Sequence, residues 1–438
     1  MGWPNFTNGR EQICYDWINN IVADPMGDRA VPAVFSPLRL PWLSYFTALP
    51  VANLIFLLIE FIDELVFGVT DAAWPLIRSD LHLNYVQIGL ALSLPGILAN
   101  LVEPFLGILG DVWKRRLLIL GGGLFFGLAC FLTAVSHSYL VLMISFIIFN
   151  PSSGAFVSLS QATLMDSDPR RHEQNMARWT FAGSVGVVLG PLLLGVAAFV
   201  GFGWRGVFFV LAGLTALLLA GAWRWLPLPT RDHPPLPQLS AVWAGLREAF
   251  AALKRREVLR WLVLLEFSDL MLDVLYGYLA LYFVDVVGFT PSRAALAVAV
   301  WTGFGLLGDF LVIPLLEKVR GVSYLRLSVW IELALFPAFL LFPNPWLKLV
   351  VAGWMGLFNS GWYAILQGNL YSAMPGRSGT VMALGDVAGL FGKLIPFGIG
   401  LAAQAFGLAP AMWILLAGPL ALLIGLPRRL PSPTTEPT

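Results

Sequence analysis

Acidic side chains stand inside long apolar stretches of this sequence. Glu60, Asp63 and Glu64 are spaced so that all three share one stripe of a helix. A second stripe consists of Glu266, Asp269 and Asp273. If these stretches lie in a membrane, each acid costs about 3 kcal/mol unless it is neutral, paired or in contact with water. Acids held away from water and near like charges are suited to exchange protons, so both stripes are candidate ion-binding positions.

Four acidic positions of the first half of the chain recur in the second half at one offset of 206 positions. The matched pairs are Glu60 with Glu266, Asp63 with Asp269, Glu103 with Asp309, and Asp111 with Glu317. Because acids are rare in these segments, chance explains the coincidence poorly, and we infer two homologous halves. For Glu103 and Asp309, a shared role in helix packing is the favoured interpretation.

The composition assigns most of the chain to a lipid bilayer. Of its 438 residues, 58% are hydrophobic and 12% are charged, whereas soluble globular proteins have about 25% charged residues. A net charge of +1 provides no basic surface for nucleic acid. The two cysteines and four histidines lack the spacing of a metal site, and the sequence contains no loop for binding ATP phosphates. We expect no metal, no cofactor and no enzymatic activity.

Twelve apolar runs are long enough to cross a bilayer core about 30 Å thick, and the first covers residues 44–70. The sequence predicts an all-α polytopic membrane protein with twelve transmembrane helices in two pseudo-symmetric six-helix halves. The expected parts are a cytoplasmic N-terminal segment (1–43), the first half (44–226), a cytoplasmic central loop with an amphipathic helix (227–258), the second half (259–426) and a cytoplasmic tail (427–438).

The basic residues predict the orientation of the chain in the membrane. Most of the 27 Lys and Arg residues fall in segments that share one side with the N-terminus. The exceptions are Arg78, Arg205, Arg293 and Lys348 on the other side, and Lys393 within a span. Cytoplasmic loops carry the excess of Lys and Arg, so both termini are expected to be cytoplasmic in a multi-pass protein of the plasma membrane.

A short motif follows the second apolar run. The segment Gly107-Ile-Leu-Gly-Asp111-Val-Trp-Lys-Arg115-Arg116 resembles the loop signature of the major facilitator superfamily, with Val112 and Lys114 departing from the usual pattern. Leu315-Leu-Glu317-Lys318 is a degraded copy. The resemblance covers about 44–426 and implies that Asp111, Arg115, Arg116 and Glu317 form an inner gate. The alternative is that the two arginines only fix topology.

The fifth span is rich in small residues. Gly186, Gly190, Pro191 and Gly195 lie at spacings that let another helix approach closely, and Pro191 removes a backbone hydrogen bond. The pattern resembles the antiporter motif of facilitator exporters, with Leu194 replacing one glycine. The alternative is a general packing seam. The sequence from 149 to 171 into span 5 resembles the fosmidomycin-resistance branch of drug exporters, although the span-4 arginine of many drug:proton antiporters is missing from 139–164.

Several polar residues are candidates for lining a central cavity. Lys393 is the basic residue well inside a span, and its expected partner is Asp386 seven positions earlier or an acid of the opposing stripe. The other candidates are Asn150, Asn359, Gln367 and Trp362. Interhelical hydrogen bonding is the alternative role for the amides, and a structural ion pair is the alternative for Lys393.

The favoured function is secondary active transport by alternating access, with proton-coupled efflux of small amphipathic or drug-like molecules. The expected partners are a small-molecule substrate, a coupling ion (a proton or sodium), membrane lipid and no nucleic acid, and the chain is expected to be a monomer. Two alternatives remain open. One is a proton- or sodium-coupled symporter that takes up a nutrient or organic ion, and the other is a membrane receptor or scaffold that does not transport.

Overall fold

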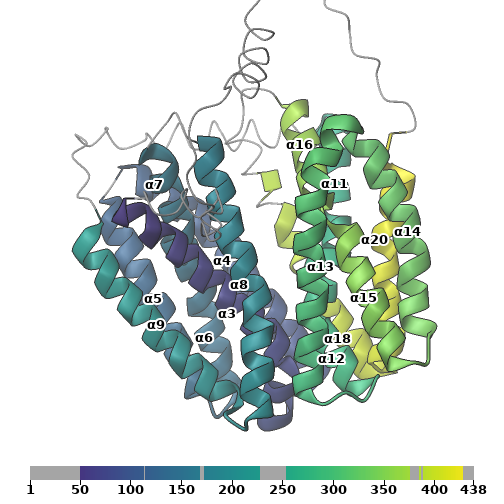
Figure 1. The fold of residues 1–438 in the computed structure, drawn as a ribbon, viewed down its shortest axis with the longest axis horizontal. Helices are drawn as coiled ribbons and strands as arrows, with labels where there is room; N and C mark the ends of the chain where they lie inside the picture. The colour runs from purple at the N-terminus through teal and green to yellow at the C-terminus, as the bar shows by residue number, and fades with distance from the viewer. Residues whose placement is uncertain are drawn as a thin grey trace, which may run out of the picture. The chain divides into compact units, whose positions relative to one another are not determined.

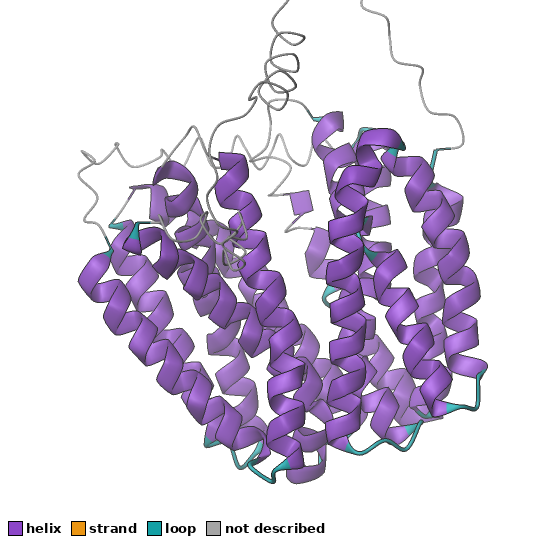
Figure 2. Cartoon of the chain, viewed as in Figure 1, coloured by secondary structure: helices purple, strands orange, loops and turns teal. Residues whose placement is uncertain are grey.

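The computed structural model describes residues 50–112, 114–167, 172–226, 253–374, 384–385 and 388–427. The expected N-terminal segment, most of the central loop, Asp386 and almost all of the expected tail lie outside these residues. Within them the chain consists of helices joined by short connections, and Figure 2 draws no strand in this part of the chain. Helices satisfy every backbone polar group internally, which a hydrocarbon environment demands.

The described residues of the first half form six helical rods. They are α3 (Val51–Leu81), α4 (Tyr85–Val112), α5 (Arg115–Ala134), the continuous run α6 (Tyr139–Ser153), η1 (Gly154–Ser158) and α7 (Leu159–Ser167), then α8 (His172–Phe199) and α9 (Gly203–Trp225). In Figure 1 these rods run from purple to teal. The element η1 is a π-helical turn, a local widening of the helix that is frequent at functional sites.

The second half repeats this plan. Its rods are α11 (Arg256–Asp269), η2 (Leu270–Val274) and α12 (Leu275–Asp285), then α13 (Pro291–Lys318), α14 (Gly321–Leu341), α15 (Pro345–Asn359) with α16 (Trp362–Ala373), the helix that includes α18 (Ile395–Phe406), and finally α19 (Leu408–Met412), η3 (Trp413–Leu416) and α20 (Ala417–Gly425). Figure 1 shows these rods in green to yellow beside the first half. The predicted all-helical fold in two halves is confirmed.

Ten helices within the described residues are long and apolar enough to cross a membrane. Two rods, α3 and the run from α11 to α12, are not among these ten. Each of these two rods carries one of the predicted acidic stripes. The acids are therefore the reason to look for chemistry in these two rods rather than in the ten more apolar ones.

The first predicted span ends too early. We expected it to stop at residue 70, but α3 continues to Leu81 and is closed by His82 in a left-handed conformation at φ 52°. The apolar run weakens at Asp71, whereas the helix itself is terminated by the turn eleven residues later. Asp71 is consequently a helical residue of the same rod that carries Glu60, Asp63 and Glu64.

The two halves pack through α3 with α12, α8 with α13, and α4 with α18. Polar contacts join them where α3 ends and α4 begins, which we call the outer end because the basic residues predict that it faces away from the cytoplasm. Arg78 pairs with Asp285, and the guanidinium also lies over the Tyr85 ring, 4.3 Å from its centroid. Tyr85 donates from its hydroxyl to Asp285 Oδ2 at 2.9 Å and from its backbone N–H to Gln404 Oε1 at 3.2 Å.

A second arginine at the same end acts inside the first half only. Arg205, at the start of α9, pairs with Asp80 and donates to the Ser136 carbonyl at 2.6 Å through Nη2. Arg78 and Arg205 are thus similar in charge and location, but only Arg78 bridges the halves. The pair offers a matched test of whether the contact between halves matters.

Replacing Arg78 with Ala should loosen the outer end, because Asp285 loses the charge that holds it beside Tyr85. If the lost contact stabilises the closed outer end by about 1 kcal/mol, the population of protein open at that end should rise roughly fivefold. The reporter is Cys placed at Leu92, which packs against Gly277 of the other half, in a background without the native cysteines. Labelling by a membrane-impermeant maleimide should rise in R78A. Equal labelling in R78A and R205A would contradict a bridging role.

Candidate functional site

The acidic stripe on α3 is largely buried within the first half. Glu60 is 8% exposed and Asp63 is 5% exposed, whereas Glu64 is half-buried. Asp63 Oδ1 accepts a hydrogen bond of 2.7 Å from Ser153 Oγ, at the junction of α6 and η1. The Glu60 carboxylate lies against Gly183 of α8. The predicted stripe is therefore divided, with Glu60 and Asp63 turned into their own half.

The stripe of the second half has a comparable division. The Glu266 carboxylate lies against Gly392, in the segment that precedes α18, as Glu60 lies against Gly183. Asp269 ends α11, and Asp273 follows in the π-helical turn η2. The side chain of Asp273 is 66% exposed, so it faces open space rather than the core of its half.

The third repeat-related pair also contacts glycines. Glu103 of α4 lies against Gly154, the first residue of η1. Asp309 Oδ1 of α13 accepts a hydrogen bond of 3.2 Å from the Gly361 backbone N–H, and Gly361 has φ +76° at the break between α15 and α16. Only glycine adopts that conformation readily. The helix break that leaves the Gly361 N–H free to donate to Asp309 therefore depends on glycine at this position. The predicted packing role of both acids agrees with these contacts.

Lys393 forms an ion pair with an acid of the stripe in its own half. Its Nζ lies 3.6 Å from Asp273 Oδ2, and the charges of Asp269 and Glu266 also act on it. The expected alternative, Asp386, lies outside the described residues. The stem of Lys393 passes 3.1 Å from the position that a Cβ on Gly96 of α4 would take. The ammonium group therefore stands where the second half meets the first.

Sequence reasoning missed Asp71. The charges of Asp273, Glu64 and Lys393 all act on this carboxylate, and its Oδ1 faces Gly277 of α12. Asp71 stands seven positions after Glu64, two helical turns along the same face, and that spacing was the available signal. The expected end of the span at residue 70 hid it.

Four charged residues from both halves thus form one group, which we call the interhalf cluster: Glu64, Asp71, Asp273 and Lys393. None of its acids belongs to the repeat. At the offset of 206 positions, Glu64 corresponds to Leu270, Asp71 to Gly277, and Asp273 to Phe67. Of the repeated acids, Glu60, Glu103 and Glu266 lie against glycines of their own half, whereas the unrepeated acids meet where the halves join.

Most of the other predicted cavity residues take part in helix packing in this structure. Asn150 Nδ2 donates to the Phe146 carbonyl at 3.1 Å, one turn earlier in α6. Trp362 is fully buried, and its Nε1 donates to Ser328 Oγ of α14 at 2.8 Å. Asn359 is 2% exposed, and Gln367 is half-buried on α16. A ligand-binding role for these residues stays a prediction.

The helix-5 glycines bring α8 against α3. A Cβ on Gly186 would lie 2.5 Å from the Phe61 carbonyl oxygen, and a Cβ on Gly190 would lie 2.7 Å from the Val69 nitrogen. Pro191 is inside α8 between these contacts and Gly195, whose carbonyl accepts a hydrogen bond of 3.1 Å from Ser292 Oγ of α13. The motif therefore forms a tight seam within the first half and continues to a contact between the halves.

The predicted inner gate is described only in part. Asp111 lies in the last turn of α4 and Glu317 in the last turn of α13, and their side chains lie outside the described residues. Arg116 Nη2 donates to the Trp223 carbonyl of α9 at 2.5 Å, a contact within the first half. The gate formed by Asp111, Arg115, Arg116 and Glu317 stays a prediction.

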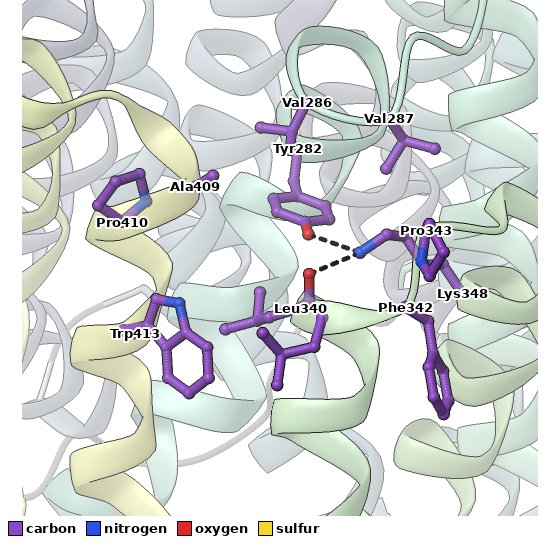
Figure 3. A pocket seen from close by; sticks show the side chains of 11 residues that line it. Tyr282, Val286, Val287, Leu340, Phe342, Pro343, Lys348, Ala409, Pro410 and Trp413 are labelled. Atoms are coloured by element: carbon purple, nitrogen blue, oxygen red, sulfur yellow. Dashed lines mark hydrogen bonds between the residues drawn. The ribbon is translucent and has the colours of Figure 1, made fainter.

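A cavity of about 490 Å³ lies at the outer end of the second half (Figure 3). Its basic residue, Lys348, donates from Nζ to the Tyr282 hydroxyl at 3.0 Å and to the carbonyls of Leu340 at 2.9 Å and Phe339 at 2.5 Å. All three ammonium protons are therefore used to fix α15 to α12 and α14. This cavity lies away from the acidic stripes, and within the described residues no group of three His, Cys, Asp or Glu side chains is arranged to hold a metal.

Comparisons with known proteins agree with this architecture. The family model described as the Major Facilitator Superfamily matches residues 56–396. The chain is similar to the quinolone resistance protein NorA of Staphylococcus aureus, at 24% identity over 277 residues that cover 62% of this chain and 68% of NorA.

Two solved structures share the fold. The nucleoside transporter NupG aligns with a TM-score of 0.70 and 12% identity, covering 86% of this chain and 98% of NupG. An inward-facing, unoccupied bacterial homologue of the human lysosomal transporter Spinster aligns with a TM-score of 0.64 and 20% identity, covering 88% and 95% of the two chains. At these identities the likeness concerns the fold alone.

Removing the cation of the interhalf cluster should destabilise the protein in a way that a second change repairs. In Lys393→Met, Asp273, Asp269 and Glu266 lose their counter-charge, and we expect a loss of about 1 kcal/mol because the pair is partly exposed. Adding Asp273→Asn should restore most of it. The measurement is thermal unfolding of the purified protein at fixed pH.

The control for this cycle is Lys348→Met, which removes a lysine held by other acceptors. Asp273→Asn should give no recovery in that background. If it rescues both lysine variants equally, or neither, the ion pair between Lys393 and Asp273 does not contribute as stated.

Proposed function

We propose that this chain, which belongs to the major facilitator superfamily, is a secondary active transporter that couples proton movement to the export of small amphipathic or drug-like molecules. The observation that carries the proposal is the placement of the acidic residues in two kinds of position. The repeat-related acids Glu60 and Glu266 lie against glycines of their own halves, and the charges of the interhalf cluster meet where the halves join. Secondary transporters hold substrate and coupling ions near the interface of their repeats, which is where the interhalf cluster lies.

Proton coupling is supported by the setting of Glu60 and Asp63. Both are less than a tenth exposed in a rod that lies within the bundle, and Asp63 receives a hydrogen bond from Ser153. A carboxyl group in such a place binds a proton when water cannot reach it and releases the proton when a conformational change admits water. A buried carboxyl group can carry a proton without further ligands, so the proton is the favoured coupling ion.

Alternating access is supported by the contacts at the outer end. Arg78, Tyr85, Asp285 and Gln404 join the halves there, and Ser93 Oγ accepts a hydrogen bond of 3.0 Å from the Phe397 backbone N–H. Rocking the halves about the interhalf cluster would break these contacts and form others at the inner end, where Asp111, Arg115 and Glu317 are the proposed gate.

Export rather than uptake is favoured by two independent observations. The similar protein NorA is named for quinolone resistance, and the α8 glycines resemble the antiporter motif of facilitator exporters. The basic residues and the bacterial relative favour the plasma membrane with both termini in the cytoplasm.

Replacing Glu60 with Gln should abolish gradient-driven transport while leaving exchange without a gradient, because Gln keeps the shape of the side chain but cannot release a proton. The assay uses proteoliposomes and a fluorescent quinolone as probe. With an acidic interior, wild-type protein should concentrate the quinolone inside, and E60Q should fall at least about tenfold. The matched control is Glu257→Gln, at an exposed acid in the first turn of α11.

The same assay separates the alternatives. Accumulation driven by the opposite gradient would indicate an uptake symporter. Binding of the quinolone with no gradient-dependent movement would favour a receptor. Wild-type coupling in E60Q would remove Glu60 from the proton path.

A further inference from the structure

Two glycines occupy the places where the repeat-related carboxylates meet a neighbouring helix. A Cβ on Gly183 of α8 would stand 2.6 Å from Glu60 Oε1, closer than real Cβ atoms approach another atom. A Cβ on Gly392 would collide with Glu266 Oε2. In each half, therefore, the carboxylate occupies the space that any other residue type would fill. Gly183 stands one turn before Gly186 on the face of α8 that packs against α3. A Cβ on Gly186 or Gly190 would meet the α3 backbone, whereas a Cβ on Gly183 would meet the Glu60 carboxylate.

The contact is repeated as the acids are repeated. Glu60 and Glu266 are 206 positions apart, and Gly183 and Gly392 are 209 apart. In the second set, Glu103 lies against the Cβ position of Gly154, whereas Asp309 accepts a hydrogen bond from the Gly361 N–H, with offsets of 206 and 207 positions. A packing coincidence would not be expected at two places in each half. A pairing of acid with glycine is thus present in both halves.

We infer that Gly183 and Gly392 are positioning residues that seat the Glu60 and Glu266 carboxylates directly on the backbone of a neighbouring helix. The inference rests on the proposed function, in which these two acids bind the coupling proton. The missing Cβ lets each carboxylate press against the peptide groups, where it is shielded from water. Loss or gain of a proton then alters the contact between helices and not only the local charge.

The charges that act on each acid are few. Glu60 is affected by Asp63 and Glu64, both on its own helix. Glu266 is affected by Lys393 and by Asp273. Substituting either glycine leaves all of these charges in place. A change in proton binding would therefore result from the altered contact between carboxylate and glycine and not from a lost charge.

The test measures proton occupancy of each acid directly and needs no transport substrate. A hydrophobic carbodiimide modifies protonated carboxyl groups, and mass spectrometry of the full-length protein in lipid gives the extent of modification at Glu60 and at Glu266 as a function of pH. Gly183→Ala should shift the pH of half-maximal modification (the midpoint) at Glu60 by at least about one pH unit and leave that of Glu266 unchanged. For comparison, the pKa values of free Asp and Glu differ by roughly 0.4 pH unit. Gly392→Ala should do the reverse.

Shortening the acid provides a second and milder variant. Glu60→Asp withdraws the carboxylate from Gly183 without overpacking, and it should also shift the midpoint. The double change Glu60→Asp with Gly183→Ala should return it toward the wild-type value, because the added methyl group fills the space that the shorter acid leaves. Controls are Gly213→Ala on α9 and Gly398→Ala on α18, where an added Cβ meets no atom within 4 Å.

The outcomes separate this inference from the proposed function. Unchanged midpoints in G183A and G392A, with pH-dependent modification in the wild type, would overturn the seats and leave proton coupling standing. Modification of Glu60 and Glu266 that does not vary with pH in the wild type would overturn both. Equal shifts in the control variants would also overturn the seats, since any added methyl group would then suffice.

Discussion

The structure depends on how carboxyl groups are accommodated in helices that must lie in lipid. An acid in this setting is stable only when it is neutral, paired or in reach of water, and the acids of this chain have three kinds of neighbour. Asp63 has a hydroxyl donor in Ser153, Asp273 has a cation in Lys393, and Glu60 and Glu266 rest on glycine backbones. The glycines of α8, the π-helical turns and the break at Gly361 all adjoin one of these acids or the seam that holds it.

The repeated and the unrepeated charged residues lie in different places. Of the acids repeated in both halves, Glu60, Glu103 and Glu266 contact glycines of their own half. Glu64, Asp71, Asp273 and Lys393 lack counterparts and meet where the halves join. At the outer end Arg78 and Asp285 close the same interface. A movement of one half against the other must therefore rearrange the interhalf cluster and the outer contacts together.

Much of the fold could be predicted from patterns along the sequence. Apolar runs predicted the helices, and the offset of the acids predicted the two halves. Asp71 was missed because hydropathy marks where lipid ends, whereas the turn at His82 marks where α3 ends. Spacing along one helix suggested Asp386 for Lys393, with a stripe acid as the alternative. Asp386 lies outside the described residues, and the 3.6 Å between Lys393 Nζ and Asp273 Oδ2 depends on helix packing that spacing does not encode. Trp362 was predicted to line a cavity, and its complete burial against Ser328 depends on contacts between helices that sequence periodicity does not encode.

The central claim is that the paired acids Glu60 and Glu266 gain and lose protons in the physiological pH range. Infrared difference spectroscopy of the protein in lipid, recorded between acidic and alkaline buffer, measures the stretching band of protonated carboxyl groups without any transport substrate. The account predicts a band that appears on acidification and is largely lost in the double variant Glu60→Gln with Glu266→Gln. A spectrum without such a band, or one that the double variant leaves unchanged, would contradict it.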